Sequence, residues 1–317
     1  MTIGPLHITQ QTILYILLAL AFNLLYDFLL GAKLVIILKH LGEKISYLHA
    51  FYIFCIAKFS SIFTPFFSGI IISKPLACKH YGKIPLKKGI FVTIFEQILD
   101  FATLLVIFPF LLLVVGQYFL NFYLQIILII TALALIIFIF VYYETLLNFI
   151  WKFKNLIPQK IRIFGQKHNI TKENTFSSFK EVKELFSNRK LLIAVFPYLL
   201  LQILLVPFVL KFTVLILGTN ISYKTSFLVY FVSVTVGKLS GLPGGLGSSD
   251  ITMGGLLLLF GFTSLQATTT VILFRFVSLA PALIIGGYLT IYLSTKYSLK
   301  FIAPSEKSDV EFHKPKN

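Results

Sequence analysis

The stretch GLPGGLGSSD, Gly241–Asp250, places a proline, four glycines, two serines and a carboxylate inside a chain that is otherwise strongly apolar. Of the 317 residues, 57% are hydrophobic and only 13% are charged, which is far from the composition of a soluble domain. Irregular backbone is tolerated at membrane depth only where protein buries it or where it lines a wet cavity. The stretch therefore predicts a broken helix that lines a polar cavity inside a membrane protein.

Apolar runs on both sides of this stretch reach the length of about 20 residues that crosses a bilayer as a helix. They include Thr12–Ala32, Gly89–Gly116, Phe122–Tyr143, Leu191–Leu217 and Thr268–Leu293. These runs are apolar on every face, whereas an outer-membrane strand would alternate between polar and apolar residues. We expect an all-α, polytopic helical membrane protein.

The basic residues predict the topology, because 23 of the 28 lie in residues 32–45, 74–88, 144–190 and 294–317. The positive-inside rule places these four stretches in the cytoplasm. We therefore expect a multi-pass protein of the cell (plasma) membrane, with its N-terminus outside and its C-terminus in the cytoplasm. The formal net charge of +16 is then a topology signal and a contact with anionic headgroups, and we expect no nucleic-acid partner.

Two segments, residues 45–74 and 224–266, must begin and end on the same side of the membrane in this topology. Each contains a helix breaker near its middle, in Thr64–Gly69 and in Leu242–Gly247. Proline removes a helical N–H, and glycine allows a tight reversal of the chain. The pattern predicts two re-entrant helical hairpins that enter from opposite faces of an inverted repeat, an architecture typical of transporters.

The expected organisation is one transmembrane domain, residues 1–293. Its first half covers about 1–143, a cytoplasmic linker covers 144–190, and its second half covers 191–293. We expect the polar cytoplasmic tail, residues 294–317, to be disordered.

The apolar segments contain seven ionisable residues, namely Asp27, Lys58, Glu96, Asp100, Lys211, Lys238 and Arg275. A charge at the centre of a membrane helix costs at least about 2.5 kcal/mol, so such residues normally face the bundle interior and pair. Glu96 and Asp100 are four residues apart and share a helix face. Their expected partners are the cations Arg275, Lys58 and Lys238. The group is either a structural ion-pair network or the lining of a cavity for a charged substrate.

For three further residues a structural role is an expected or an equally open explanation. Asp27 and Lys211 lie closer to helix ends, and we expect them to reach the interface with a structural role. Asp250 falls in the first turn of a helix that starts near Ser248, where it either caps the helix or acts directly at an anion-binding helix end. The chain has neither a nucleotide-binding loop nor a histidine pair with metal-binding spacing. We expect no catalytic residue, no metal site and no cofactor.

The run TPFFSGIIISKPLACKHYGKIPLKKGIFVTIFEQILD, followed by GLPGGLGSSD and by LFRF around Arg275, resembles a known family. It is similar to the transmembrane flippase domain of lysylphosphatidylglycerol synthases and to the stand-alone YbhN-like membrane proteins. The family pattern usually has Glu where this chain has Asp250, and it is richer in glycine and acidic residues where this chain has SGIIISKP with Lys74. The resemblance implies a helical membrane fold that moves lipids with charged headgroups between leaflets.

The leading hypothesis is a lipid flippase whose partners are membrane lipids with charged headgroups. The predicted substrate-binding and translocation residues are Lys58, Thr64, Pro65, Gly69, Glu96, Asp100, Lys238, Pro243, Gly244, Gly245, Gly247, Asp250 and Arg275. One alternative is a membrane-embedded accessory or scaffold protein that works with enzymes of envelope lipid or glycan synthesis. Another is an enzyme that acts on a polyprenyl-phosphate lipid.

Overall fold

The computed structural model describes residues 9–64, 68–119, 130 and 184–297, and this part of the chain contains helices and no strand. The first half comprises α1 (Gln10–His40), α2 (Tyr47–Ile62), α3 (Ser68–Gly82) and α4 (Leu86–Phe119). The second half comprises α9 (Arg189–Ile216), α10 (Tyr223–Leu239), the short 3-10 helix η3 (Pro243–Gly245), α11 (Ser248–Leu259), α12 (Ser264–Pro281), the π-helical turn η4 (Ala282–Gly286) and α13 (Gly287–Tyr297).

Three of the described helical segments are long and apolar enough to cross a membrane, namely Gln10–His40, Arg189–Ile216 and Ser264–Tyr292. The chain is thus an all-α, polytopic membrane protein, as the sequence predicts. The expected helix at 122–143, most of the linker 144–190 and residues 298–317 of the tail lie outside the described residues.

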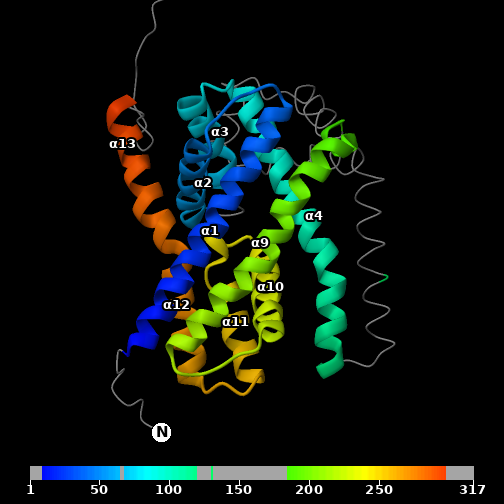
Figure 1. Ribbon diagram of the computed structural model, residues 1–317, viewed down its shortest axis with the longest axis vertical. Coiled ribbons are helices and arrows are strands. Elements are labelled where there is room, and N and C mark those ends of the chain that lie inside the picture. Colours follow the sequence, from blue (N-terminus) through cyan, green and yellow to red (C-terminus); the bar gives the residue numbers. More distant parts are fainter. Residues whose placement is uncertain (1–8, 65–67, 120–129, 131–183, 298–317) are drawn as a thin grey trace, which may run out of the picture.

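The same order of elements occurs twice: a long helix, a hairpin of two short helices, and a second long helix. Figure 1 shows α2 and α3 in the upper half of the molecule and α10 and α11 in the lower half. The long helices α1 and α9 cross the molecule in opposite directions and pack against each other. This arrangement is what two oppositely oriented halves would give.

The four hairpin helices have 12 to 17 residues each. At 1.5 Å per residue they are roughly 18–26 Å long, shorter than the hydrocarbon core of about 30 Å. Their length and reversal fit helices that enter a bilayer and return, and the re-entrant insertion itself remains a prediction.

Polar residues fix where these helices begin. The Ser46 hydroxyl accepts a hydrogen bond from the His49 N–H at the start of α2, and Ser222 accepts one from Thr225 at the start of α10. Such caps satisfy backbone donors that the first turn leaves without partners. The two hairpins therefore begin at equivalent, locally encoded signals.

The structure corrects two expected boundaries. Helix α1 continues eight residues beyond Ala32, because KLVIILKH forms regular helix until the chain turns at Gly42, where φ is +76°. Lys33 therefore lies in the helix and not in a cytoplasmic loop. Lys74 also lies inside a helix, α3, which begins at Ser68 and runs through Pro75 to Gly82. Both lysines are buried.

Two large apolar clusters hold most of the helices together, and a smaller third one joins α4 to α9 and α10. One joins the second half of α1 to α2, α3, α4 and the start of α9, and it includes Leu38, Ile53, Phe95 and Leu191. The other joins the first half of α1 to the end of α9 and to α10, α11 and α12. Because α1 and α9 contribute to both clusters, they fix the two hairpins relative to each other.

Candidate functional site

The turn that opened the sequence analysis lies against the first hairpin. Gly244, Gly245 and Gly247 have φ values of +58°, +67° and +84°, a conformation that side chains with a Cβ rarely adopt. A Cβ on Gly244 would lie 3.4 Å from the Cα of Ile62 at the end of α2. The glycine turn of the second hairpin thus touches the end of α2 in the first.

The turn of the first hairpin is closed by Thr64, whose hydroxyl accepts a 2.7 Å hydrogen bond from the Gly69 N–H. A Cβ on Gly69 would come within 2.4 Å of the Ser60 carbonyl oxygen, so the close return of the chain depends on glycine. Pro65 lies outside the described residues. Thr64 and Gly69 serve the turn itself and do not line the cavity described next.

A cavity of about 260 Å³ lies where the two halves meet, and residues of α1, α2, α3, α4, α9, α10, η3 and α12 line it. Six of the predicted site residues are among its walls: Lys58, Glu96, Asp100, Lys238, Gly244 and Arg275. Asn23, Tyr26, Lys33, Lys74 and Tyr230 add polar groups that the sequence analysis did not select. The site is therefore a polar chamber inside an apolar bundle.

Ion pairs neutralise most of its charges. Lys33 Nζ lies 2.5 Å from Asp100 Oδ1, and Lys74 Nζ contacts Glu96 Oε2. The expected partners of Glu96 and Asp100, which were Arg275, Lys58 and Lys238, are therefore wrong. The physical reason is that α1 and α3 continue as helices past their last expected residues and carry two lysines to the face of α4.

Asp27 also differs from expectation. Instead of reaching the interface, it is fully buried, with its two carboxylate oxygens 2.7 and 3.0 Å from Lys58 Nζ. Asn23, one turn earlier on α1, donates to the carbonyl oxygen of Val277 at 3.2 Å. The pair fixes α1 to α2, while Asn23 fixes α1 to α12.

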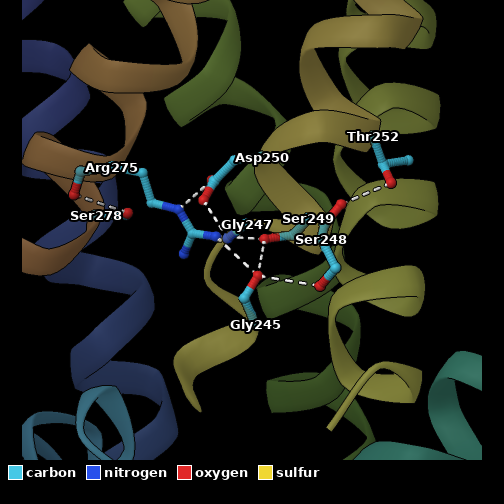
Figure 2. Close-up of polar contacts among 8 residues, drawn as sticks. All are labelled: Gly245, Gly247, Ser248, Ser249, Asp250, Thr252, Arg275 and Ser278. Atoms are coloured by element: carbon cyan, nitrogen blue, oxygen red, sulfur yellow. Dashed lines mark hydrogen bonds and ion pairs between the residues drawn. The ribbon is translucent and has the colours of Figure 1, made fainter. Parts of the chain in front are cut away.

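Arg275 is held by the glycine turn of the second hairpin and by the first turn of α11 (Figure 2). Its Nε donates to Asp250 Oδ1 at 2.5 Å, and its Nη2 donates to Ser249 Oγ and to the Gly245 carbonyl oxygen at 3.4 Å. The other oxygen of Asp250 accepts from the Gly247 N–H at 2.9 Å. Asp250 therefore both caps α11, which starts at Ser248 as expected, and pairs with Arg275. Neither Pro243, Gly245, Gly247 nor Asp250 lines the cavity.

Two polar side chains of the chamber each have an atom that lacks an ion-pair or hydrogen-bond partner among the described residues. Lys238, in the last turn of α10, forms no ion pair with any acid among the described residues. Glu96 is buried, and its Oε1 has no hydrogen-bond partner in the described part of the chain. These are the groups that a bound molecule could satisfy.

The sequence analysis missed Lys33 and Lys74 as site residues because it counted them with the basic loops. A signal for Lys33 was present, since KLVIILKH continues the apolar helical pattern of Thr12–Ala32 without proline or glycine. Lys74 had none, because Pro75 follows it directly and proline usually disfavours helix at the preceding residue.

Comparison with known proteins agrees with this fold. The family described as lysylphosphatidylglycerol synthase TM region matches residues 7–286, which include every described element of the site. Comparison with curated proteins gave no match. The chain belongs to the family of the lysylphosphatidylglycerol synthase TM region, and this membership supports a membrane function related to lipids.

Proposed function

We propose that this protein is a lipid flippase, which moves a lipid with a charged headgroup between the two leaflets. The observation that carries the proposal is the chamber of about 260 Å³, lined by five cations and two carboxylates, between two hairpins from opposite halves. Charged side chains inside a membrane-spanning bundle cost free energy. Their gathering around one hollow supports a charged substrate.

The chamber fits a headgroup better than a whole lipid. Its volume is below the range of about 300–1,000 Å³ that is usual for pockets of drug-sized ligands, so the acyl or isoprenoid chains would remain in the bilayer. Fixed charges and tyrosines in the chamber would replace water around the headgroup. Moving a headgroup in this way lowers the cost of its desolvation and, for simple exchange, requires neither a cofactor nor a chemical reaction.

The orientation belongs to the same proposal. In Figure 1 the end of α1, the α3–α4 connection, the start of α9 and the end of α13 lie at one end of the molecule, and the start of α1 lies at the other. In the sequence each of the helix ends in the first set contains or adjoins one of the four basic stretches, so the positive-inside rule would place that end in the cytoplasm of a cell membrane.

Reconstitution tests the proposal. The purified chain is placed in vesicles that contain traces of fluorescent lipids, and dithionite reports how fast each lipid leaves the protected inner leaflet. We expect faster exchange than in empty vesicles. Arg275→Ala removes the group that joins α12 to the hairpin turn and should abolish the acceleration.

Arg189→Ala is the matched control, because Arg189 is exposed at the start of α9 and lies outside the chamber. Exchange no faster than in empty vesicles for anionic, zwitterionic and polyprenyl-phosphate lipids alike would contradict the flippase. That result would favour an accessory protein of envelope lipid or glycan synthesis.

A further inference from the structure

The charges of the chamber do not balance. Five cations line it, namely Lys33, Lys58, Lys74, Lys238 and Arg275. Within the described residues, four carboxylates neutralise four of them, one each: Asp100, Asp27, Glu96 and Asp250. The described chamber therefore carries one formal positive charge. Buried charges are normally paired, so this excess indicates that the occupant supplies a negative charge.

Lys238 is the cation that remains. It lines the chamber from α10, one turn from the residues that lead into the glycine turn. Asp100, which lines the same chamber, is already bound by Lys33 at 2.5 Å. Arg275, the obvious anion ligand from the sequence, has in contrast its charge paired with Asp250, and it also donates to Ser249 and Gly245.

Glu96 adds a second requirement. Its Oε2 accepts from Lys74, while Oε1 has no partner among the described residues although the residue is only 1% exposed. An unsatisfied buried acceptor costs free energy until a donor reaches it. A hydroxyl donor would satisfy Oε1 without altering the charge, whereas an ammonium donor would restore the positive excess.

We infer that the headgroup received by the chamber is a phosphodiester with one net negative charge and a free hydroxyl, and that Lys238 binds its phosphate. The inference rests on the proposed function and narrows its substrate class from charged to anionic. A zwitterionic headgroup would leave the excess charge of the chamber uncompensated, and a cationic headgroup would increase it. A phosphate group free in solution has the same chemistry, so the experiment includes it as a separate arm.

The test compares two fluorescent probes in phosphatidylcholine vesicles that contain the full chain, labelled phosphatidylglycerol and labelled phosphatidylcholine. We expect phosphatidylglycerol to exchange faster. Lys238→Gln should lower its rate by at least about tenfold, since a charge-assisted hydrogen bond to phosphate is lost, and Lys238→Arg should retain most of it.

Lys211→Gln is the matched control. Lys211 is also a lysine within a membrane helix, it has no ion pair among the described residues, and it does not line the chamber. We expect this variant to exchange phosphatidylglycerol at the wild-type rate. An equal loss in both lysine variants would overturn the assignment to Lys238.

Inorganic phosphate in the buffer distinguishes the two sources of the ligand. Slower exchange of phosphatidylglycerol in its presence supports a site that binds the phosphate group from either source. An unchanged rate, with the preference for phosphatidylglycerol intact, supports a site that requires the whole lipid headgroup.

Lipid binding to the purified protein, read by native mass spectrometry, separates this inference from the flippase itself. Binding of phosphatidylglycerol that depends on Lys238, without exchange in vesicles, would contradict the flippase and support the anionic site. Equal exchange of both probes, unaffected by Lys238→Gln, would support a flippase and overturn the anionic site. The binding measurement uses purified protein without vesicles, so it also tests a variant that reconstitutes poorly.

Discussion

Asp27 has no solvent exposure, and Lys58 holds it at 2.7 Å with only 18% of its own side chain exposed. Removing one member of a buried ion pair leaves the other without a partner, which costs about 3–5 kcal/mol. The ion pairs around the chamber therefore have a structural role, whatever the chamber binds.

The first prediction concerns this pair. Asp27→Asn should lower the free energy of unfolding by about 3 kcal/mol, because the Lys58 ammonium, in a partly buried site, loses the one carboxylate of the described residues that pairs with it. The double variant Asp27→Asn/Lys58→Met should recover part of that loss. Thermal unfolding of the purified protein in detergent measures both.

An exposed pair provides the control. Lys88 and Glu43 lie 2.6 Å apart with 45% and 22% of their side chains exposed, and such pairs contribute about 0–1 kcal/mol. Glu43→Gln should therefore shift the unfolding temperature little. Equal shifts of the unfolding temperature for Asp27→Asn and Glu43→Gln would contradict the expectation that the buried ion pair contributes more to stability than the exposed one.

At this scale the sequence identified most of the charged residues within the membrane segments, but it missed Lys33 and Lys74 and did not show which residues pair. Glu96, Asp100, Lys58, Lys238 and Arg275 stand out because charges are rare in apolar runs. Their partners depend on how helices distant in sequence are placed. Asp100 and Lys33 are 67 positions apart, and no local pattern relates them.

The packing of α2 against the π-helical turn η4 shows how closely the elements of the two halves approach. A Cβ on Gly286 would lie 2.2 Å from the carbonyl oxygen of Cys55, closer than side chains are ever found. Small residues at helix crossings allow such approach in membrane proteins. Gly286 therefore fixes the distance between the first hairpin and the last membrane segment.

A second prediction follows for this contact. Gly286→Ala should lower the unfolding temperature, because the added methyl group meets backbone atoms and not the flexible end of a side chain. Gly255→Ala is the control, since Gly255 lies inside α11 with nothing within 4 Å of its Cβ position. Alanine in a helix interior is favoured over glycine by about 1 kcal/mol, so that variant should be neutral or more stable. A Gly286→Ala protein as stable as the wild type would contradict the close crossing.

The breakers and caps of the elements could be predicted from the sequence, whereas their crossing points could not. The turn at Gly241–Asp250 was predictable because proline and glycine act locally, and α11 begins at Ser248 as expected. The extension of α1 to His40 was missed although KLVIILKH continues the apolar pattern, because basic residues were taken as the end of the membrane segment. A basic residue can lie within a helix, so charge alone does not mark where a helix ends.

At the scale of the whole molecule, the account depends on one arrangement: two opposed hairpins that enclose a polar chamber between two halves. The repeated order of elements and the contact of Gly244 with the end of α2 are the observations behind it. The charge topology predicted the repeat, since it required both hairpins to return to their own side. The closure of the chamber by lysines of α1 and α3 required the three-dimensional structure.

Ser278 offers direct access to this chamber, because it lines the cavity from α12 and is partly exposed there. The two native cysteines, Cys55 and Cys78, are buried and unpaired, and replacing them with alanine gives a background without reactive thiols. In that background Ser278→Cys provides a single thiol in the chamber, and Phe276→Cys provides one on the outer face of the same helix, where Phe276 is 73% exposed.

The decisive measurement is lipid exchange in vesicles before and after treatment of the Ser278→Cys protein with a negatively charged methanethiosulfonate. The account predicts that the reagent modifies Ser278→Cys, that exchange stops, and that dithiothreitol restores it, while treatment of Phe276→Cys, whose thiol would face the lipid, leaves exchange unchanged. A Ser278→Cys protein that resists the reagent, or that exchanges lipid at the same rate once modified, would contradict a headgroup path through the chamber.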